Sequence, residues 1–182
     1  MYQYYDYPYA SRVKSKLYQE IENNLVHGVM GGGYITSVSL HKKGIREVDI
    51  IVQWINNLVP QIAYKFTQGG DDSDKGVGFN NSFEIEELWG MIYNKGEGVV
   101  KHNHFPWCMS FCYFVNVPKN CVPFILEGKR IKPIEGRMIV FPSFLYHSAP
   151  PSKCDGRCVI AGNISSTSFL DNIFLYLRKT LL

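Results

Sequence analysis

The sequence predicts a mainly β protein, a sandwich or closed barrel that helices brace on one side. From Phe83 onward, short segments rich in β-branched and aromatic residues follow one another, with turn residues between them. No helical interval separates these segments, which argues against a parallel sheet with crossover helices. Before residue 66, two stretches instead show the apolar spacing of amphipathic helices. At 182 residues, we expect one domain, 1–182, with its own core.

The N-terminal part, about residues 1–66, is expected to form a helical support. The tyrosine-rich segment 1–10 should pack across the surface of the domain. The first helix is expected to begin at Ser11, a preferred N-cap residue, and to end at His27-Gly28. Its apolar residues recur every four positions, at Val13, Leu17, Ile21 and Leu25.

A strand and a second helix are expected to follow. The segment YITSVSL, residues 34–40, predicts a strand, and HKKG predicts a turn. The second helix should begin near Ile45 and present an apolar stripe to the core. Pro60 should end it, because proline has no backbone N–H to continue the helical hydrogen bonds.

The β-rich core is expected to span about residues 83–168. Its predicted strands are FEIEELWGMIY, VVKHNH, SFCYFVNV, CVPFIL, KRIKPI, GRMIVFP, SFLYHSA and RCVIAGNIS. The polar, glycine-rich segment 67–81 predicts a solvated loop that could act as a lid over a site. The tail FLDNIFLYLRKTLL could be a strand or a helix that docks on the outside.

Composition excludes several classes of protein. The formal charge of +3 is small and its lysines and arginines are scattered, so nucleic acid is not indicated as a partner. No apolar run reaches the length of a membrane span, and the N-terminus lacks the apolar segment of a signal peptide. Five cysteines without the paired spacing of a zinc site are typical of reduced thiols in a cytoplasmic protein.

The segment YNKGEGVVKHNHFPW contains the strongest functional signal. His102 and His104 are one residue apart, and alternate side chains of an extended strand point to the same face. His147 follows in FPSFLYHSAPP and could bring a third imidazole from a distant strand. Neutral imidazole is a common ligand of iron, zinc, copper and nickel, so these residues predict a metal site. For His27 and His41, an ordinary structural role is favoured.

These motifs carry a resemblance to a known family. The pattern Y-x(2)-G-x-G-x(3)-H-x-H, then YFVN, EGRMIVFPSFLYHSAPP and GR-x-V-x-AGN, resembles the iron(II)/2-oxoglutarate-dependent dioxygenases. It is most similar to their prolyl-hydroxylase-like branch and to small phage and bacterial oxygenases of that branch. The similarity covers about Trp89 to Asn163. It implies a double-stranded β-helix, a jelly-roll or cupin-like barrel, with the metal in its open mouth.

The resemblance also implies roles for particular residues. His102 matches the first metal histidine and His147 the distal one, while Arg157 matches the basic residue that binds the far carboxylate of 2-oxoglutarate. Tyr93 matches a tyrosine that points toward the cosubstrate. The implied activity is hydroxylation of an unidentified substrate (a peptide, a nucleobase or a small molecule), with Fe(II) as cofactor, 2-oxoglutarate as cosubstrate, and release of succinate and carbon dioxide. Asn163, Met91, Phe105 and Trp107 are candidates for the cavity wall.

One residue departs from the family pattern. The family presents His-x-Asp or His-x-Glu, whereas His104 stands at the acid position. His104 could be a ligand in a three-histidine set, which the spacing from Tyr93 favours. Alternatively, His104 could be the first ligand with Pro106 at the acid's place, as in related halogenases, or activity could be lost.

Two other kinds of protein compete with this interpretation. A cupin-type metal protein would have the same barrel without 2-oxoglutarate, but the glutamate expected after the second histidine is absent and Arg157 would have no function. A non-catalytic barrel used for interaction is the other alternative. Exposed barrel edges would also allow a homodimer.

Overall fold

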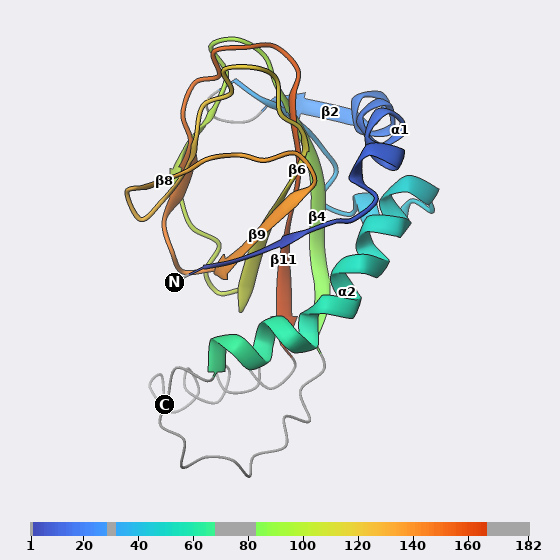
Figure 1. Ribbon diagram of the computed structural model, residues 1–182, viewed down its shortest axis with the longest axis vertical. Coiled ribbons are helices and arrows are strands. Elements are labelled where there is room, and N and C mark those ends of the chain that lie inside the picture. Colours follow the sequence, from blue (N-terminus) through green and yellow to red (C-terminus); the bar gives the residue numbers. More distant parts are fainter. Residues whose placement is uncertain (1, 29–31, 68–82, 167–182) are drawn as a thin grey trace, which may run out of the picture.

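The computed structural model describes residues 2–28, 32–67 and 83–166, which form two antiparallel sheets with helices against one of them (Figure 1). The larger sheet has the order β1 (Gln3–Asp6), β9 (Arg137–Pro142), β6 (Met109–Asn116), β11 (Arg157–Ser166), β4 (Phe83–Tyr93), β3 (Tyr34–Thr36) and β2 (Leu25–Gly28). The smaller sheet has the order β5 (Val99–His102), β10 (His147–Ala149), β7 (Phe124–Leu126) and β8 (Lys129–Ile131). The expected mainly β fold with flanking helices, a double-stranded β-helix, is confirmed.

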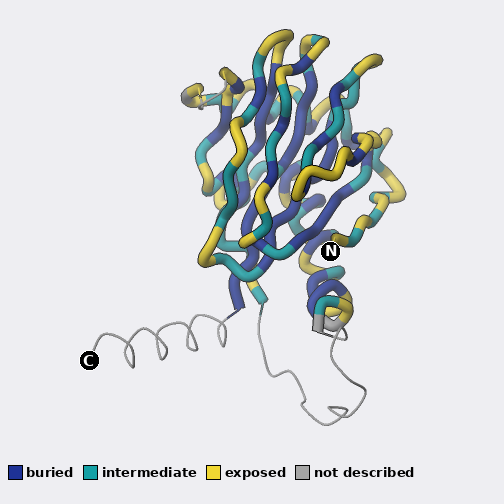
Figure 2. The backbone as a smooth tube through the Cα atoms, turned by 90° about the vertical axis from the view of Figure 1, so that its left-hand side faces the viewer, coloured by how far each residue is buried: buried dark blue, intermediate teal, exposed yellow. Residues whose placement is uncertain are grey.

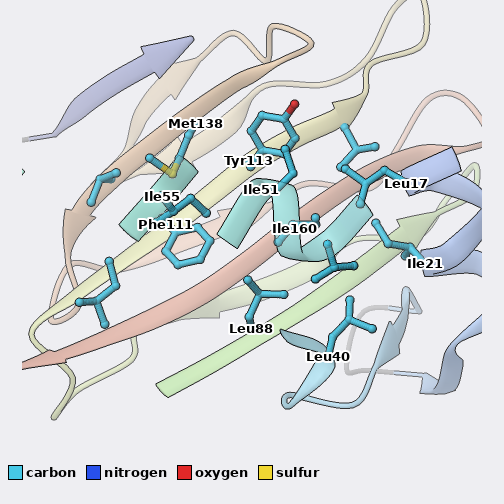
Figure 3. Close-up of a cluster of buried hydrophobic side chains, with 14 of the residues drawn as sticks. Leu17, Ile21, Leu40, Ile51, Ile55, Leu88, Phe111, Tyr113, Met138 and Ile160 are labelled. Atoms are coloured by element: carbon cyan, nitrogen blue, oxygen red, sulfur yellow. The ribbon is translucent and has the colours of Figure 1, made fainter. Parts of the chain in front are cut away.

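The larger sheet is buried on both faces because its strands alternate between two apolar clusters. On β11, Cys158 and Ile160 pack toward the helices, whereas Val159 packs toward the smaller sheet. Figure 3 shows the helix-side cluster, which includes Leu17, Ile21 and Ile160. Burial consequently runs along the central strands, with exposed segments at their ends (Figure 2). Each fully buried aliphatic side chain contributes about 1.5–3 kcal/mol.

The first helix, α1, spans Ala10–Asn23 and buries the predicted residues Val13, Leu17 and Ile21. Its predicted ends were wrong. Tyr9, not Ser11, is the N-cap, and it makes no side-chain capping hydrogen bond. The chain leaves the helix at Asn24 because Leu25–Gly28 forms β2, whose backbone pairs with β3 instead of continuing the helical hydrogen bonds.

The second helix, α2, spans Arg46–Thr67 and begins where the sequence predicted. The expectation that Pro60 ends it was wrong, since Pro60 lies inside the helix. Val59, Ile62 and Ala63 are buried on both sides of the proline, so packing of the last turns compensates for the missing N–H. Preceding it, the predicted strand 34–40 is limited to β3, and Leu40–Lys42 forms a 3-10 turn, η1.

Four of the eight predicted core strands agree closely with the structure. β4 coincides with the segment FEIEELWGMIY, and β11, β6 and β9 lie within one residue of their predicted positions. The other four are shorter than predicted, since β5 ends at His102 and β8 at Ile131, while β7 begins at Phe124 and β10 at His147. The N-terminal segment adds β1 to the sheet edge beside β9. The predicted lid loop and C-terminal tail lie outside the described residues, and the homodimer stays a prediction.

Two further findings concern the sequence-based exclusions. No helix among residues 2–28, 32–67 and 83–166 is long and apolar enough to cross a membrane. Cys108, Cys112, Cys121, Cys154 and Cys158 are all free thiols, as the cysteine spacing predicted.

Candidate metal centre

The first two histidines meet through the pairing of β5 and β10. His102 is the last residue of β5, and its Cα partner across the ladder is His147, the first residue of β10. Their ring centroids lie 4.3 Å apart. The pairing thus joins residues that are far apart in sequence, as the metal-site interpretation requires.

The third histidine reaches the same point from a turn. His104 lies beyond the end of β5, and its backbone N–H donates to the carbonyl of Ser143, at 2.8 Å. Its ring is 4.8 Å from that of His102 and 4.9 Å from that of His147, and it packs against Trp89 at 5.6 Å. One ligating atom from each of the three histidines lies within 4.8 Å of the others. All three predicted ligands therefore converge, although His104 does so without the predicted strand geometry.

Hydrogen bonds orient two of the imidazoles. Nδ1 of His102 lies 2.9 Å from the carbonyl of Val100, and Nδ1 of His147 lies 3.2 Å from the carbonyl of Leu145. Because a carbonyl can only accept, each Nδ1 carries the proton and donates. Each Nε2 then presents its lone pair, which is how metal-binding histidines are usually held.

The electrostatics keep His104 and His147 in the neutral form that a metal needs. Burial lowers the pKa of His104 to about 3, with added repulsion from His147 and His102. Burial also lowers the pKa of His147 to about 4, aided by repulsion from His102. Both imidazoles are consequently unprotonated at neutral pH, and a divalent ion would displace no proton from either.

The histidines lie on the wall of a cavity of about 420 Å³ between the two sheets. Its volume is in the range of small-molecule sites. Tyr93 and Arg157 line the same cavity, so all five predicted site residues share one space. Much of the remaining wall is apolar, with contributions from Ile35, Val38, Met91, Val99, Val100, Phe124, Phe141, Ala149, Val159 and Ala161.

Arg157 is the most unusual group in the cavity. Its side chain enters the fold directly after Gly156, whose φ of 72° makes the turn into β11. Only 1% of Arg157 is exposed, and its Nε and Nη1 have no hydrogen-bond partner. The guanidinium instead lies over the ring of Tyr93, 5.3 Å from its centroid. A buried cation without a carboxylate or carbonyl partner is costly, so this position suits an anionic ligand.

Tyr93 is fixed beside the arginine by the β4–β11 ladder, in which the two residues are Cα partners. Its hydroxyl donates to Sδ of Met91, at 3.1 Å. Burial raises the pKa of Tyr93 well above its usual value, so the phenol stays protonated. Tyr93 thus offers an aromatic face to Arg157 and a neutral hydroxyl to the cavity.

The remaining residues that the sequence suggested for the cavity wall have mixed outcomes. Met91 lines the cavity, whereas Phe105 and Trp107 are not on its wall. Asn163 points to the same side of β11 but is buried, where Ser110 donates to it. His41 lies apart from the three-histidine cluster, as expected.

Trp89 and Glu87 are among the cavity residues that the sequence analysis missed. Counting back from Tyr93 in steps of two along β4 gives Met91, Trp89 and Glu87, all on the inner face. Strand alternation was therefore a sufficient signal for both residues.

The residues present fit both groups that the family resemblance implies. Three imidazole nitrogens suit iron or another divalent transition metal. The unpartnered guanidinium in the same cavity suits the far carboxylate of 2-oxoglutarate, because it can donate two parallel hydrogen bonds. The convergence of both His102 and His104 also favours the three-histidine set over a site that leaves His102 out.

Comparison with known proteins supports the same fold. No protein-family model matches the chain, and no curated protein matches it significantly. Among solved structures, a prolyl-4-hydroxylase from Pseudomonas putida has a TM-score of 0.65 at 16% identity, covering 90% of this chain and 91% of that one. The viral collagen prolyl hydroxylase of Paramecium bursaria Chlorella virus-1, solved as its 2OG complex, has a TM-score of 0.65 at 13% identity, covering 90% and 94%.

A third similar structure is an oxidoreductase of the 2OG-Fe(II) oxygenase family from Burkholderia pseudomallei, with a TM-score of 0.60 at 12% identity, covering 90% of this chain and 84% of that one. The chain thus has the fold of the prolyl-hydroxylase-like 2-oxoglutarate/iron(II) oxygenases. At these identities the likeness establishes the fold, and the activity must be argued from the site.

Proposed function

We propose that this protein is an iron(II)- and 2-oxoglutarate-dependent oxygenase that hydroxylates an unidentified substrate and releases succinate and carbon dioxide. The observation that carries the proposal is the buried, unpartnered guanidinium of Arg157 in the cavity that also holds three converging histidines. A metal centre and an anion site within one cavity are the two requirements of this chemistry. The fold that it shares with known oxygenases of this kind supports the same conclusion.

In this proposal, each residue has a definite role. His102, His104 and His147 hold the iron through their free ring nitrogens. Arg157 binds the far carboxylate of 2-oxoglutarate, and Tyr93 keeps the guanidinium in place through its ring. Bound iron and 2-oxoglutarate supply the oxidising chemistry, while the protein orients the reactants and excludes water with its apolar walls.

The competing kinds of protein account for fewer of these features. A cupin-type metal protein explains the histidines but provides no anion for Arg157. A non-catalytic barrel requires neither the convergence of three imidazoles nor a buried cation facing the cavity. His104 stands where this family usually has an acidic ligand. A set of three histidine ligands still leaves half of the coordination positions of an octahedral ion open.

The substrate is proposed as a peptide, a nucleobase or a small molecule. A prolyl hydroxylase of this fold from Trichoplax adhaerens was solved with a hypoxia-inducible-factor peptide fragment (TM-score 0.62, 15% identity, covering 89% of this chain and 82% of that one), which makes a peptide one option.

Five free thiols support a location in the reducing cytoplasm.

Anaerobic titration of the protein with Fe(II) and 2-oxoglutarate tests the proposal. We expect a weak visible charge-transfer band in the wild type and slow formation of succinate after oxygen is admitted. His147→Ala should remove the band because it deletes a ligand. His41→Ala is the matched control and should keep the band, since His41 lies outside the cluster. An intact band in the His147 variant, or tight metal binding without any effect of 2-oxoglutarate, would contradict the proposal.

A further inference from the structure

Glu87 lies on the cavity wall at the end opposite Arg157. In the β4–β11 ladder, Arg157 pairs with Tyr93, and six residues further along β11, Asn163 pairs with Glu87. Trp89 lies between the two ends and packs against His104. The three-histidine cluster therefore lies beside the middle of this wall, with a cationic side chain at one end and a carboxylate at the other. Six strand residues correspond to about 20 Å.

A buried chain of hydrogen bonds fixes the Glu87 carboxylate. Asn163 Nδ2 donates to Glu87 Oε2 at 2.7 Å, and Ser110 Oγ donates to Asn163 Oδ1 at 2.8 Å. Ser110 Oγ in turn lies 2.7 Å from Ser143 Oγ. Asn163, Ser110 and Ser143 are 1%, 2% and 0% exposed, so this support is rigid and shielded from water.

The same support reaches the metal centre. The carbonyl of Ser143 accepts the backbone N–H of His104, so the carboxylate and the histidine are positioned by a common residue. Glu87 is not part of the metal-ligand cluster, which consists of the three histidines. Its carboxylate is therefore a preorganised group directed at something other than the metal.

The composition of the wall indicates what that partner is. Glu87 is the one carboxylate among the described residues that line the cavity, and most of its neighbours there are apolar. A carboxylate in such a place gains most from a charge-assisted hydrogen bond to a cation. The packing of Arg157 on Tyr93 holds its guanidinium at the other end of the wall. A cation that meets the Glu87 carboxylate inside the cavity would therefore come from the ligand.

We propose that Glu87 is a specificity-determining residue that binds a protonated amine or guanidinium of the substrate to be oxidised. This inference rests on the proposed oxygenase function and narrows its substrate to a basic molecule or a basic peptide side chain. Arg157 then binds the anionic cosubstrate, and Glu87 orients the cationic substrate on the other side of the three histidines.

Binding of two matched probe pairs tests this inference. Nα-acetyl-lysine amide is compared with Nα-acetyl-norleucine amide, and Nα-acetyl-arginine amide with Nα-acetyl-citrulline amide, since each pair differs by a positive charge at nearly constant shape. Affinities are measured by calorimetry on protein loaded with Mn(II) and 2-oxoglutarate, and on protein without either. We expect the charged member of at least one pair to bind about tenfold tighter to the wild type, the scale of one charge-assisted hydrogen bond.

Glu87→Gln should remove this preference while keeping an acceptor for Asn163. Glu86→Gln is the matched control, because Glu86 accepts a hydrogen bond from Ser165 and does not line the cavity. It should keep the tenfold preference. Thermal unfolding of each variant establishes that it is folded before binding is compared.

The outcomes separate this inference from the proposed function. No preference for charge in either pair, or a preference that survives Glu87→Gln, would overturn the role of Glu87 even if metal and 2-oxoglutarate bind normally. Conversely, a Glu87-dependent preference in a protein that binds neither metal nor 2-oxoglutarate would support the recognition site and refute the oxygenase.

Discussion

Replacement of Arg157 by methionine should make the ligand-free protein more stable and unable to respond to 2-oxoglutarate. The guanidinium is 1% exposed with two unpartnered nitrogens, and an unsatisfied buried donor costs about 1–3 kcal/mol, more when charged. Its contact with the Tyr93 ring returns about 2 kcal/mol. Methionine fills the space of the aliphatic stem without a charge, so we expect a gain of about 1–2 kcal/mol, or roughly 2–8 °C in Tm.

The ligand-bound protein should show the opposite order. A ligand present at 100 times its Kd stabilises the folded state by about 2.7 kcal/mol, so the wild type should gain roughly 5–11 °C when Mn(II) and 2-oxoglutarate are added. The Arg157→Met variant should gain stability from Mn(II) alone and nothing more from 2-oxoglutarate. Thermal unfolding followed by circular dichroism, with and without each ligand, measures both effects.

Arg137→Met provides the matched control. Arg137 forms two hydrogen bonds to Asp6, at 2.7 and 2.8 Å, at the edge of the larger sheet. Because this ion pair is partly exposed, its loss should cost at most about 1 kcal/mol and leave the 2-oxoglutarate response intact. The role assigned to Arg157 would be wrong if ligand-free Arg157→Met were several kcal/mol less stable than the wild type, or if it kept the full 2-oxoglutarate response.

Two further predictions concern stability. Burial lowers the pKa of His147 from 6.5 to about 4, so on acidification the unfolded chain takes up a proton before the folded one; this residue should lower metal-free stability by up to about 3 kcal/mol from pH 7 to pH 4, in addition to the contribution of His104. His147→Gln should make the pH dependence in urea unfolding shallower by this share and leave that of His104, and an unchanged slope would contradict the assignment. Gly90→Ala should cost about 1–3 kcal/mol, because its Cβ would lie 2.6 Å from Cγ2 of Ile21, whereas Gly28→Ala, with nothing nearer than 3.7 Å, should not suffer this clash; equal melting temperatures of the two variants would count against this packing argument.

Much of the fold could be predicted because the local sequence of its strands itself favours strand structure. The segment that became β4 combines aromatic and β-branched residues with flanking turns, and its bounds were predicted without error. The errors occurred where long-range packing prevailed over local preference. Pro60 locally favours the end of a helix, but burial of Ile62 and Ala63 stabilises the turns of α2 that follow it. The segment Leu25–Gly28 was predicted as the end of the first helix, but it pairs with β3 at the sheet edge. Such tertiary effects leave little trace in the local sequence.

The histidines and Arg157 were easier to predict than the residues that support Glu87. The spacing of His102, His104 and His147, together with Arg157, carried enough information to identify the residues that converge in the cavity. The role of the Ser110–Asn163–Glu87 support was not visible, because it joins three strands through side-chain hydrogen bonds. Only the register of β6, β11 and β4 brings these residues together.

The two halves of the site differ in how firmly the fold holds them. Arg157 and Glu87 lie on β11 and β4, which pair along their whole length in the interior of the larger sheet. His104, in contrast, lies in a turn whose position depends on the backbone bonds from His104 to Ser143 and from Ser143 to Cys108. Because β5 ends at His102, the imidazole of His104 reaches the cluster through this turn rather than through strand geometry. The Ser143 turn is therefore the element on which the proposed metal site most depends. Because Ser143 also supports Glu87, the geometry of the proposed metal site and that of the proposed cation site should change together.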